Sequence, residues 1–440
     1  INSLIASDGI GTIHLWYGDV SSSIALMNKM QTLSKVPILF DADIEYGLNQ
    51  RFPSGTDLPP LMAIAATSDI ENAYQVGKII AKEARAVGVH WNLSPVVDVN
   101  NNPLNPIINT RSFGEDPKGV SEFGISLMKG LQDHGMLATA KHFPGHGDTE
   151  TDSHYSLAMI PSDSARLWSV EISPFQAMSD AGVDAIMVAH VHAPDYQPEA
   201  DKPSSLSPFW IQSILREKIG FKGVVVTDAM SMGGISKNYS DAFALIETIK
   251  AGSDVIIQNN NYKGSIDTIE KAVNDGEISI HRINESVLKV LKMKEKVGLF
   301  KSTKISLDSY YNSFQKKEHK IIAKQVAQEA ITCVKYDSSI FPFSTTNRDT
   351  LYVIDIYDSR NNHEMSSVTK GLKKSRLKIK TLQIDESDSK VVLNAMLNEI
   401  PENALVLING FASPKAKKNR IFLPGNETEF LHALMNKTDR

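Results

Sequence analysis

Short apolar runs alternate, over the first 300 residues, with segments in which apolar residues recur at helical spacing. The runs are almost continuously apolar, which is typical of strands that are covered on both faces. Strands of this kind, separated by amphipathic helices, predict a parallel α/β domain. The predicted strands are Gly11–Trp16, Pro37–Asp43, Val89–Val97, Leu137–His142, Ala185–His190, Gly223–Asp228 and Asp254–Gln258.

The segment Ser68–Val87 illustrates the helical pattern. Ser68 and Glu71 predict a capping box at its start, and Gly88 predicts its end. One face collects the apolar residues Ile70, Ala73, Val76, Ile80, Ala84 and Val87. A second helix, Arg282–Val297, is expected to close the domain, with Gly298 after it.

Polar residues follow nearly every predicted strand, and they are Asp43, Asp98, Lys141, His142, His190 and Asp228. Many strand ends that converge on one site are typical of a (β/α)₈ barrel. An open dinucleotide-binding sheet would carry Gly-x-Gly-x-x-Gly after its first strand, and that motif is not there. We expect the eighth strand before Ile1, or in a stretch too irregular to recognise.

A second region follows the predicted barrel. Three further strands, Leu351–Ile356, Leu377–Ile384 and Ala404–Ile408, alternate with helical patterns and predict a smaller parallel α/β sandwich. We therefore expect a catalytic TIM-type barrel over 1–300, a linker over 301–317 and a sandwich over 318–440. The abrupt start at Ile1 suggests that the barrel is trimmed, and the sandwich is expected to be incomplete.

The composition, with 42% hydrophobic and 22% charged residues, is that of an ordinary soluble globular protein. Residues 301–440 hold an excess of basic residues, so the acidic excess lies in 1–300 and argues against nucleic acid as a partner. No apolar run reaches the roughly 18 residues of a membrane span. The single Cys333 excludes an internal disulfide framework. Oligomeric state stays open, as does location in the bacterial cell envelope or the cytoplasm.

The most distinctive stretch is Lys-His-Phe-Pro-Gly-His-Gly at residues 141–147, followed after four residues by Asp-Ser-His at 152–154. Its Gly and Pro residues indicate a loop, and a loop rich in titratable side chains at a strand end is a common place for catalysis. A solvated surface loop is the alternative. The pattern resembles the signature of the β-N-acetylglucosaminidases of glycoside hydrolase family 3, and the resemblance covers nearly the whole chain.

The resemblance implies a retaining mechanism. Asp228, within Thr-Asp-Ala-Met, matches the nucleophile that forms a covalent glycosyl-enzyme. His154 matches the residue that protonates the leaving oxygen, and Asp152 would fix the tautomer of its ring. From the residues alone, Asp228 could instead cap the following helix, and the His–Asp pair could lie on the surface.

The resemblance also implies five sugar-binding residues, and these are Asp43, Arg51, Arg111, Lys141 and His142. Tyr46 replaces the first Gly of the family's Asp-x-Glu-Gly-Gly segment, which puts the local pocket shape in doubt. A salt bridge at the barrel rim and a buried structural pair are the alternatives for these charges. Asp98 is expected to orient Arg111 or Lys141.

The function that these resemblances imply is that of an exo-acting β-N-acetylhexosaminidase. It would release terminal N-acetylglucosamine from peptidoglycan-derived or related glycans, with no metal and no cofactor. His190 and His192 could suggest zinc together with the loop histidines, but their spacing matches no known ligand set. A β-glucosidase or a β-glycoside phosphorylase of the same family, or an inactive sugar-binding protein, are the alternatives.

Overall fold

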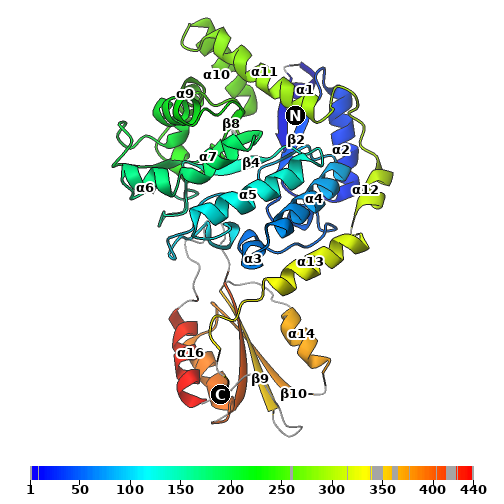
Figure 1. The fold of residues 1–440 in the computed structure, drawn as a ribbon, viewed down its shortest axis with the longest axis vertical. Helices are drawn as coiled ribbons and strands as arrows, with labels where there is room; N and C mark the ends of the chain where they lie inside the picture. Colours follow the sequence, from blue (N-terminus) through cyan, green and yellow to red (C-terminus); the bar gives the residue numbers. More distant parts are fainter. Residues whose placement is uncertain are drawn as a thin grey trace. The chain divides into compact units, whose positions relative to one another are not determined.

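The computed structural model describes every residue except 1, 8, 258–260, 315, 337, 339–349, 359–364, 376, 403, 413–422, 424 and 439–440. The described residues group into two compact units, one within residues 1–331 and the other within 332–440. Figure 1 traces the chain through both units from blue to red.

Parallel strands form the centre of the first unit. One sheet contains β1 (Thr12–His14), β2 (Leu39–Ala42) and β3 (Trp91–Asn92), and a second contains β4 (Thr139–Phe143), β6 (Ala185–Val188) and β8 (Val224–Thr227). Two isolated parallel bridges, Trp91 with Leu137 and Val96 with Lys141, join the two sheets, and another joins Val226 to Val255. The described strands of this series therefore follow one another in chain order, all parallel.

Six of the seven predicted strand segments contain strands of this series, although most of these strands are shorter than predicted. The segment Val89–Val97 was predicted as one strand, but only Trp91–Asn92 is regular, and Val96 makes a single bridge with Lys141. Pro95 explains this, because proline has no N–H for the ladder. The seventh segment makes only the bridge at Val255, and its last residue, Gln258, lies outside the described residues.

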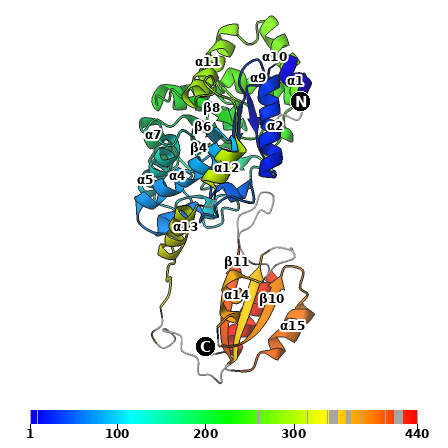
Figure 2. The ribbon, with the colours of Figure 1, turned by 90° about the vertical axis from the view of Figure 1, so that its right-hand side faces the viewer.

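Helices lie on both sides of these strands in the two ribbon views (Figures 1 and 2). They are α1 (Asn2–Ser7), α2 (Val20–Leu33), α3 (Leu61–Ala66), α4 (Ile70–Val87), α5 (Pro117–Gln132), α6 (Ser164–Ser169), α7 (Ser173–Asp180), η4 (Phe209–Lys218), α8 (Gly233–Ser236), α9 (Asp241–Ala251), α10 (Tyr262–Asn274), α11 (Ile280–Lys296), α12 (Leu307–Ser313) and α13 (Lys317–Glu329). Three 3₁₀ turns, Leu48–Gln50, Asn109–Arg111 and Ser204–Leu206, and a short parallel pair, β5 (Ala158–Met159) with β7 (Val191–His192), complete this unit.

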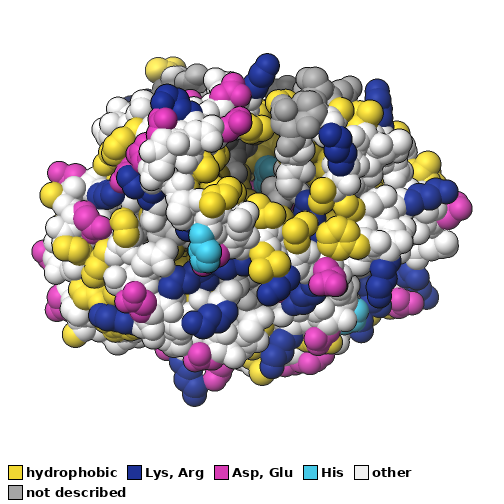
Figure 3. Space-filling view, turned by 90° about the horizontal axis from the view of Figure 1, so that it is seen from above, with side chains coloured by type: hydrophobic (Ala, Val, Ile, Leu, Met, Phe, Trp, Pro, Cys, Tyr) yellow, Lys and Arg dark blue, Asp and Glu magenta, His cyan; other side chains and the backbone are white. Residues whose placement is uncertain are grey.

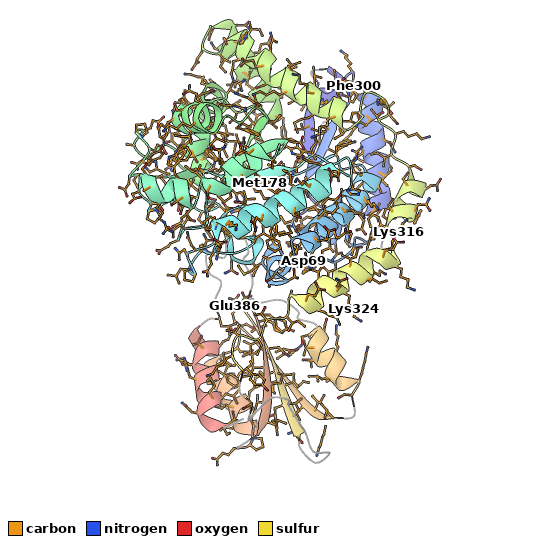
Figure 4. The ribbon with its side chains drawn as sticks, in the orientation of Figure 1. Asp69, Met178, Phe300, Lys316, Lys324 and Glu386 are labelled. Carbon is orange, nitrogen blue, oxygen red and sulfur yellow. The ribbon has the colours of Figure 1, made fainter. Side chains whose placement is uncertain are left out.

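Helix α4 begins one residue later than the capping box predicted. Asp69, labelled in Figure 4, accepts a hydrogen bond from the Glu71 N–H and is the N-cap, whereas Ser68 has a positive φ of 57°. The prediction of Ser68 as the cap was therefore wrong, because the neighbouring carboxylate takes the free N–H. Gly88 ends the helix in the left-handed conformation, as predicted.

Helices α4 and α5 pack closely through two glycines. A Cβ atom on Gly77 would lie 2.3 Å from the Leu127 carbonyl oxygen, and one on Gly130 would lie 2.2 Å from the Tyr74 carbonyl oxygen. On the other side of α5, a Cβ on Gly124 would lie 3.5 Å from Sδ of Met178, a buried residue of α7 that is labelled in Figure 4. These contacts fix the outer helices against the strands that they cover.

The second unit has a parallel sheet with β9 (Thr350–Tyr357) between β10 (Lys378–Asp385) and β11 (Leu405–Phe411). The helices α14 (Ser367–Lys373), α15 (Lys390–Glu399) and α16 (Gly425–Lys437) alternate with the strands, as the βαβαβ pattern predicted. Figure 1 shows α14 and α16 on opposite faces of this sheet.

The segment predicted as a linker, residues 301–317, contains α12, and α13 follows it. We expected α13 to open the second region, but its residues group with the first unit. His319 of α13 explains this grouping, because its Nδ1 lies 2.8 Å from Oε1 of the buried Glu83 on α4. Figure 4 labels Lys316 and Lys324, which mark this part of the chain.

Figure 3 shows one face of the molecule, on which acidic, basic and hydrophobic side chains are mixed and the surface is hollowed near its centre. In the part of the chain that the structure describes, none of the helices is both long enough and apolar enough to cross a lipid bilayer.

His90 generates a prediction about acid stability. It is buried, its Nδ1 accepts a hydrogen bond of 3.3 Å from the Phe40 N–H, and burial together with the nearby Arg85 lowers its pKa to about 3. The unfolded chain takes up this proton near pH 6.5, so the free energy of unfolding should fall as the pH drops from about 6.5 towards 3. His90→Gln keeps an acceptor for Phe40 and should reduce this fall.

The measurement is the urea midpoint at about pH 7 and about pH 5, followed by tryptophan fluorescence. All four tryptophans lie within residues 1–331, so the signal reports on the first unit. His281→Gln, at an exposed histidine of α11, is the control. An equal loss of stability in wild type and His90→Gln would contradict the prediction.

Candidate active site

Asp43 lies just beyond β2, and three basic side chains surround its carboxylate. Lys141 Nζ lies 2.7 Å from Oδ1, and Arg51 Nη2 lies 3.4 Å and His14 Nε2 3.7 Å from Oδ2. Arg51 Nε also donates to the Asp43 carbonyl oxygen at 2.8 Å. Burial alone would raise the pKa of Asp43, but Lys141 and the other cations lower it below its usual value. Asp43 is thus an ionised acceptor for hydroxyl groups.

Glu45 is a buried carboxylate that the sequence reasoning missed as a site residue. Arg111 binds both of its oxygens, with Nε 2.9 Å from Oε2 and Nη2 2.8 Å from Oε1. Lys141 Nζ lies 2.8 Å from Oε1. These two cations hold the pKa of Glu45 well below its usual value despite the opposing effect of burial. Glu45 therefore fixes Arg111 and Lys141 in place beside Asp43.

His14, the last residue of β1, was also missed. It is the register partner of Asp41 on β2, and its Nδ1 lies 2.6 Å from the buried Asp41 Oδ1. Burial alone would lower the pKa of His14, but Asp41 and Asp43 raise it above its usual value. A histidine at the end of an apolar strand was the signal that could have revealed it.

Asp98 has a partner that we did not expect. We predicted that it would orient Arg111 or Lys141, but its Oδ2 lies 2.7 Å from Nδ1 of His142. Its Oδ1 accepts a hydrogen bond of 2.7 Å from the His146 N–H. The prediction was wrong because Glu45 already binds both Arg111 and Lys141. Asp98 therefore orients His142 and the start of the 145–154 loop.

Asp228 directly follows β8 and accepts a hydrogen bond of 2.7 Å from the Ala229 N–H. Burial alone would raise its pKa, but its electrostatic interactions with the imidazole rings of His142, His190 and His154 lower it to about 2. The alternative role as a helix cap does not hold, because α8 has Met232 at its N-cap position. Asp228 is therefore an ionised carboxylate that faces a group of imidazoles.

His154 and Asp152 form a close pair. His154 Nδ1 lies 2.7 Å from Asp152 Oδ1, and the same oxygen accepts a hydrogen bond of 2.9 Å from the His154 N–H. Two backbone hydrogen bonds, from Gly233 N–H to the His154 carbonyl and from Gly234 N–H to the Ser153 carbonyl, are both 3.1 Å long. They attach the loop that carries His154 to the segment that follows Asp228.

Two further histidines have structural partners. His146 shapes the loop, with Nδ1 2.6 Å from Thr149 Oγ1 and Nε2 2.9 Å from Ser153 Oγ, and burial lowers its pKa to about 4. His190 Nε2 lies 3.0 Å from the carbonyl oxygen of Ala229, beside Asp228. Burial lowers the pKa of His190, so both rings are neutral near pH 7.

The eight residues that the sequence reasoning selected lie in one connected group. Lys141 and Arg51 meet at Asp43, and Lys141 and Arg111 share Glu45. His142 follows Lys141 in the chain. His142 and His154 both lower the pKa of Asp228, and His154 is itself paired with Asp152. The arrangement combines three ionised carboxylates, Asp43, Glu45 and Asp228, with a histidine–aspartate pair and a set of cations.

Residues 2–293 match the family model described as "Glycosyl hydrolase family 3 N terminal domain". The chain belongs to glycosyl hydrolase family 3. It is 30% identical over 356 residues to the "Beta-N-acetylglucosaminidase/beta-glucosidase" of Cellulomonas fimi, a match that covers 79% of this chain. The match spans 63% of that relative, which is less than two thirds of its length.

Another relative in the family is "Beta-hexosaminidase A" of Pseudoalteromonas piscicida, 28% identical over 94% of this chain and 73% of its own length. Among solved structures, the chain resembles a glycoside hydrolase family 3 β-N-acetylglucosaminidase from Paenibacillus sp. str. FPU-7. That likeness has a TM-score of 0.87 at 30% identity and covers 100% of this chain and 84% of the other. The family 3 neighbours share the mixed α/β fold with parallel sheets.

Glu45 generates a prediction about stability. Glu45→Gln removes the anion that Arg111 and Lys141 share and leaves the buried Lys141 and the partly buried Arg111 short of a partner. Breaking a buried ion pair from one side should lower the free energy of unfolding by about 3 kcal/mol. Urea unfolding followed by tryptophan fluorescence measures this change. Glu122→Gln, which removes an exposed pair with Lys118, is the control and should change little. Equal changes in the two variants would refute the prediction.

Proposed function

We propose that this protein is an exo-acting, retaining β-N-acetylhexosaminidase that hydrolyses terminal N-acetylglucosamine from peptidoglycan-derived or related glycans. One observation carries the proposal, which is that a partly buried, ionised Asp228 lies near a His154–Asp152 pair in a chain of family 3. The names of the family relatives from Cellulomonas fimi and Pseudoalteromonas piscicida point to the same substrate class.

The proposal includes a (β/α)₈ barrel within residues 1–300 and a smaller α/β sandwich within 318–440. The alternation of side chains in the strands supports the barrel. Ala185 and Met187 of β6, with Val224 and Val226 of β8, join one apolar cluster, which also contains Leu39 and Trp91 of β2 and β3. The intervening Ile186 and Val225 join the cluster that contains the helix residues. A barrel whose interior is filled by side chains is expected to have one inner cluster, to which successive parallel strands each contribute alternate residues.

In the first chemical step, Asp228 is the nucleophile and His154 is the proton donor. Asp228 Oδ attacks the anomeric carbon as the bond from that carbon to the leaving oxygen breaks. The bond between His154 Nδ1 and Asp152 keeps a proton on Nδ1, so the other nitrogen, Nε2, delivers its proton to the leaving oxygen. The products of this step are the free aglycone and a glycosyl ester of Asp228.

The second step releases the sugar. The now neutral His154 Nε2 removes a proton from water as the water oxygen attacks the anomeric carbon. The ester bond breaks, its electrons return to the Asp228 carboxylate, and His154 is protonated again. Two inversions at the same carbon give retention of configuration. The first step needs Asp228 to be ionised, and its pKa of about 2 satisfies that condition over the working pH range. The same low pKa makes the Asp228 carboxylate a good leaving group in the second step.

The charged group around Asp43 would hold the terminal sugar. Asp43 offers free lone pairs to hydroxyl hydrogens, and Lys141, Arg51 and Arg111 offer N–H donors to hydroxyl or carbonyl oxygens. His142, held by Asp98, would complete the contacts near Asp228. Binding that tightens as the ring distorts stabilises the transition state more than the ground state.

A β-glucosidase or a β-glycoside phosphorylase of the same family is the second candidate. The printed name of the Cellulomonas fimi relative includes β-glucosidase, which makes the choice of sugar an open test. A phosphorylase would use phosphate in place of water in the second step. The interactions of His154 with both Asp152 and Asp228 argue against the alternative of an inactive sugar-binding protein.

Turnover of two chromogenic sugars tests the proposal. Wild type should cleave p-nitrophenyl β-N-acetylglucosaminide faster than the glucoside, and Asp228→Asn should lose about 10⁴-fold or more in kcat. His154→Ala should lose less on a dinitrophenyl leaving group than on a poor one, because an activated aglycone needs no proton. Faster cleavage of the glucoside, an inverted product or a sugar phosphate formed in phosphate buffer would reject the proposed reaction.

The attachment of the His154 loop generates a separate prediction. Gly233→Ala would place a Cβ 2.2 Å from the Tyr155 carbonyl oxygen and 2.8 Å from that of His154, so the loop must shift. A displaced proton carrier should lower kcat/KM on a poor leaving group by about 10²-fold, with a smaller loss on the dinitrophenyl glycoside. Gly371→Ala, where a Cβ would have open space, is the control. Equal losses on both substrates would contradict a role for the loop in proton transfer.

A further inference from the structure

Three exposed aromatic side chains lie beside the charged group. Trp16 and Tyr17 follow β1, and Tyr46 follows Glu45, with 54%, 69% and 37% of their surfaces exposed. We call Trp16, Tyr17 and Tyr46 the aromatic patch. Aromatic side chains contribute much of the energy of cores and interfaces, so a cluster of them left in water at the edge of a polar site indicates a binding surface.

Arg51 connects the aromatic patch to Asp43. Its Cζ lies 4.8 Å from the ring centroid of Trp16 and 5.3 Å from that of Tyr17. Its Nη2 lies 3.4 Å from Asp43 Oδ2. Tyr46 is close enough to Arg51 and Tyr17 for both to affect the pKa of its hydroxyl. The patch and the proposed sugar site are therefore continuous.

The cation–π contacts also set the orientation of the two rings. A guanidinium over an aromatic face is attracted by the ring quadrupole, and Arg51 is itself fixed by two contacts with Asp43. The His14 ring lies 5.5 Å from the Trp16 ring, measured between centroids. Trp16 is thus held from two sides while about half of its surface stays exposed. A preorganised ring costs little ordering entropy when a ligand binds.

The patch lies on one particular side of the proposed sugar site. Trp16 and Tyr17 contact Arg51, which lies beside Asp43 after β2. Asp228, in contrast, follows β8, a strand of the other sheet. A sugar with its anomeric carbon at Asp228 and its hydroxyls at Asp43 therefore has the patch beyond its far edge. A group that reaches the patch must be attached to the sugar on the side away from the anomeric carbon.

We propose that Trp16, Tyr17 and Tyr46 form a second carbohydrate subsite, which binds a pyranose ring attached to the non-reducing side of the sugar whose glycosidic bond is cleaved. The inference rests on the proposed function. A pyranose ring presents C–H bonds on its face, and the negative face of an aromatic ring attracts their positive hydrogens. The enzyme then also removes a disaccharide from a chain end, in addition to the single terminal sugar.

The test compares p-nitrophenyl glycosides of N-acetylglucosamine and of its β-1,4-linked disaccharide. Direct release of the disaccharide with p-nitrophenol requires the second ring to lie on the non-reducing side, and chromatography of the initial products identifies it. We expect wild type to release the disaccharide directly. Trp16→Ala should lower the ratio of kcat/KM for this release to kcat/KM on the monosaccharide glycoside by about tenfold.

Two variants control the measurement. Trp16→Phe keeps a ring and should retain most of the ratio. Tyr311→Ala removes a tyrosine of α12 that is 69% exposed, as Tyr17 is, and should leave the ratio unchanged. An unchanged ratio in Trp16→Ala, or a wild type that cleaves the monosaccharide glycoside but releases no disaccharide, overturns the second subsite and leaves the proposed function standing. A wild type that cleaves neither glycoside overturns both.

Discussion

The neutralisation of buried charge at the ends of the parallel strands is the constraint on which the rest of the site depends. Lys141 has almost no exposed surface, and it is stable there because Asp43 and Glu45 both lie within 2.8 Å of its Nζ. An isolated ammonium at this depth would lose several kcal/mol of solvation. The two carboxylates in turn need Arg51 and Arg111, so a single lysine at the end of β4 links the loops that follow β2 and β3.

His142, the residue after Lys141, is likewise held by a buried carboxylate. His142 is held by Asp98 and also lowers the pKa of Asp228, so the two halves of the site are joined through the consecutive residues Lys141 and His142. The pKa values follow from this arrangement. Carboxylates that are surrounded by cations stay ionised despite burial, and His146 and His190, which have neutral hydrogen-bond partners, stay uncharged. The carboxylates of Asp43, Glu45 and Asp228 are therefore ionised near neutral pH, and the imidazoles of His146 and His190 are neutral.

The sequence indicated the candidate site residues better than it indicated the contacts between them. Asp43, Lys141 and Asp228 were found because a polar residue directly after an apolar run is a local signal that needs no structure. The partner of Asp98 could not be found in this way, because it depends on the twist of neighbouring strands and on which cation another carboxylate already binds. Glu45 was missed for the same reason, since its importance lies in contacts with residues far away in the chain. His14 did carry a local signal, a histidine at the end of an apolar strand, and that signal was not used.

The bonds between Gly233 and His154 and between Gly234 and Ser153 join main-chain atoms only. The spacing between the loop at 152–155 and the end of β8 is therefore set by peptide groups, whose geometry does not change when side chains are exchanged. Exposed neighbours on the loop, such as Glu150 and Ser156, can consequently be exchanged without moving the imidazole. In a lineage of such chains, the outer side chains of this loop can diversify while the spacing between His154 and the end of β8 is inherited unchanged.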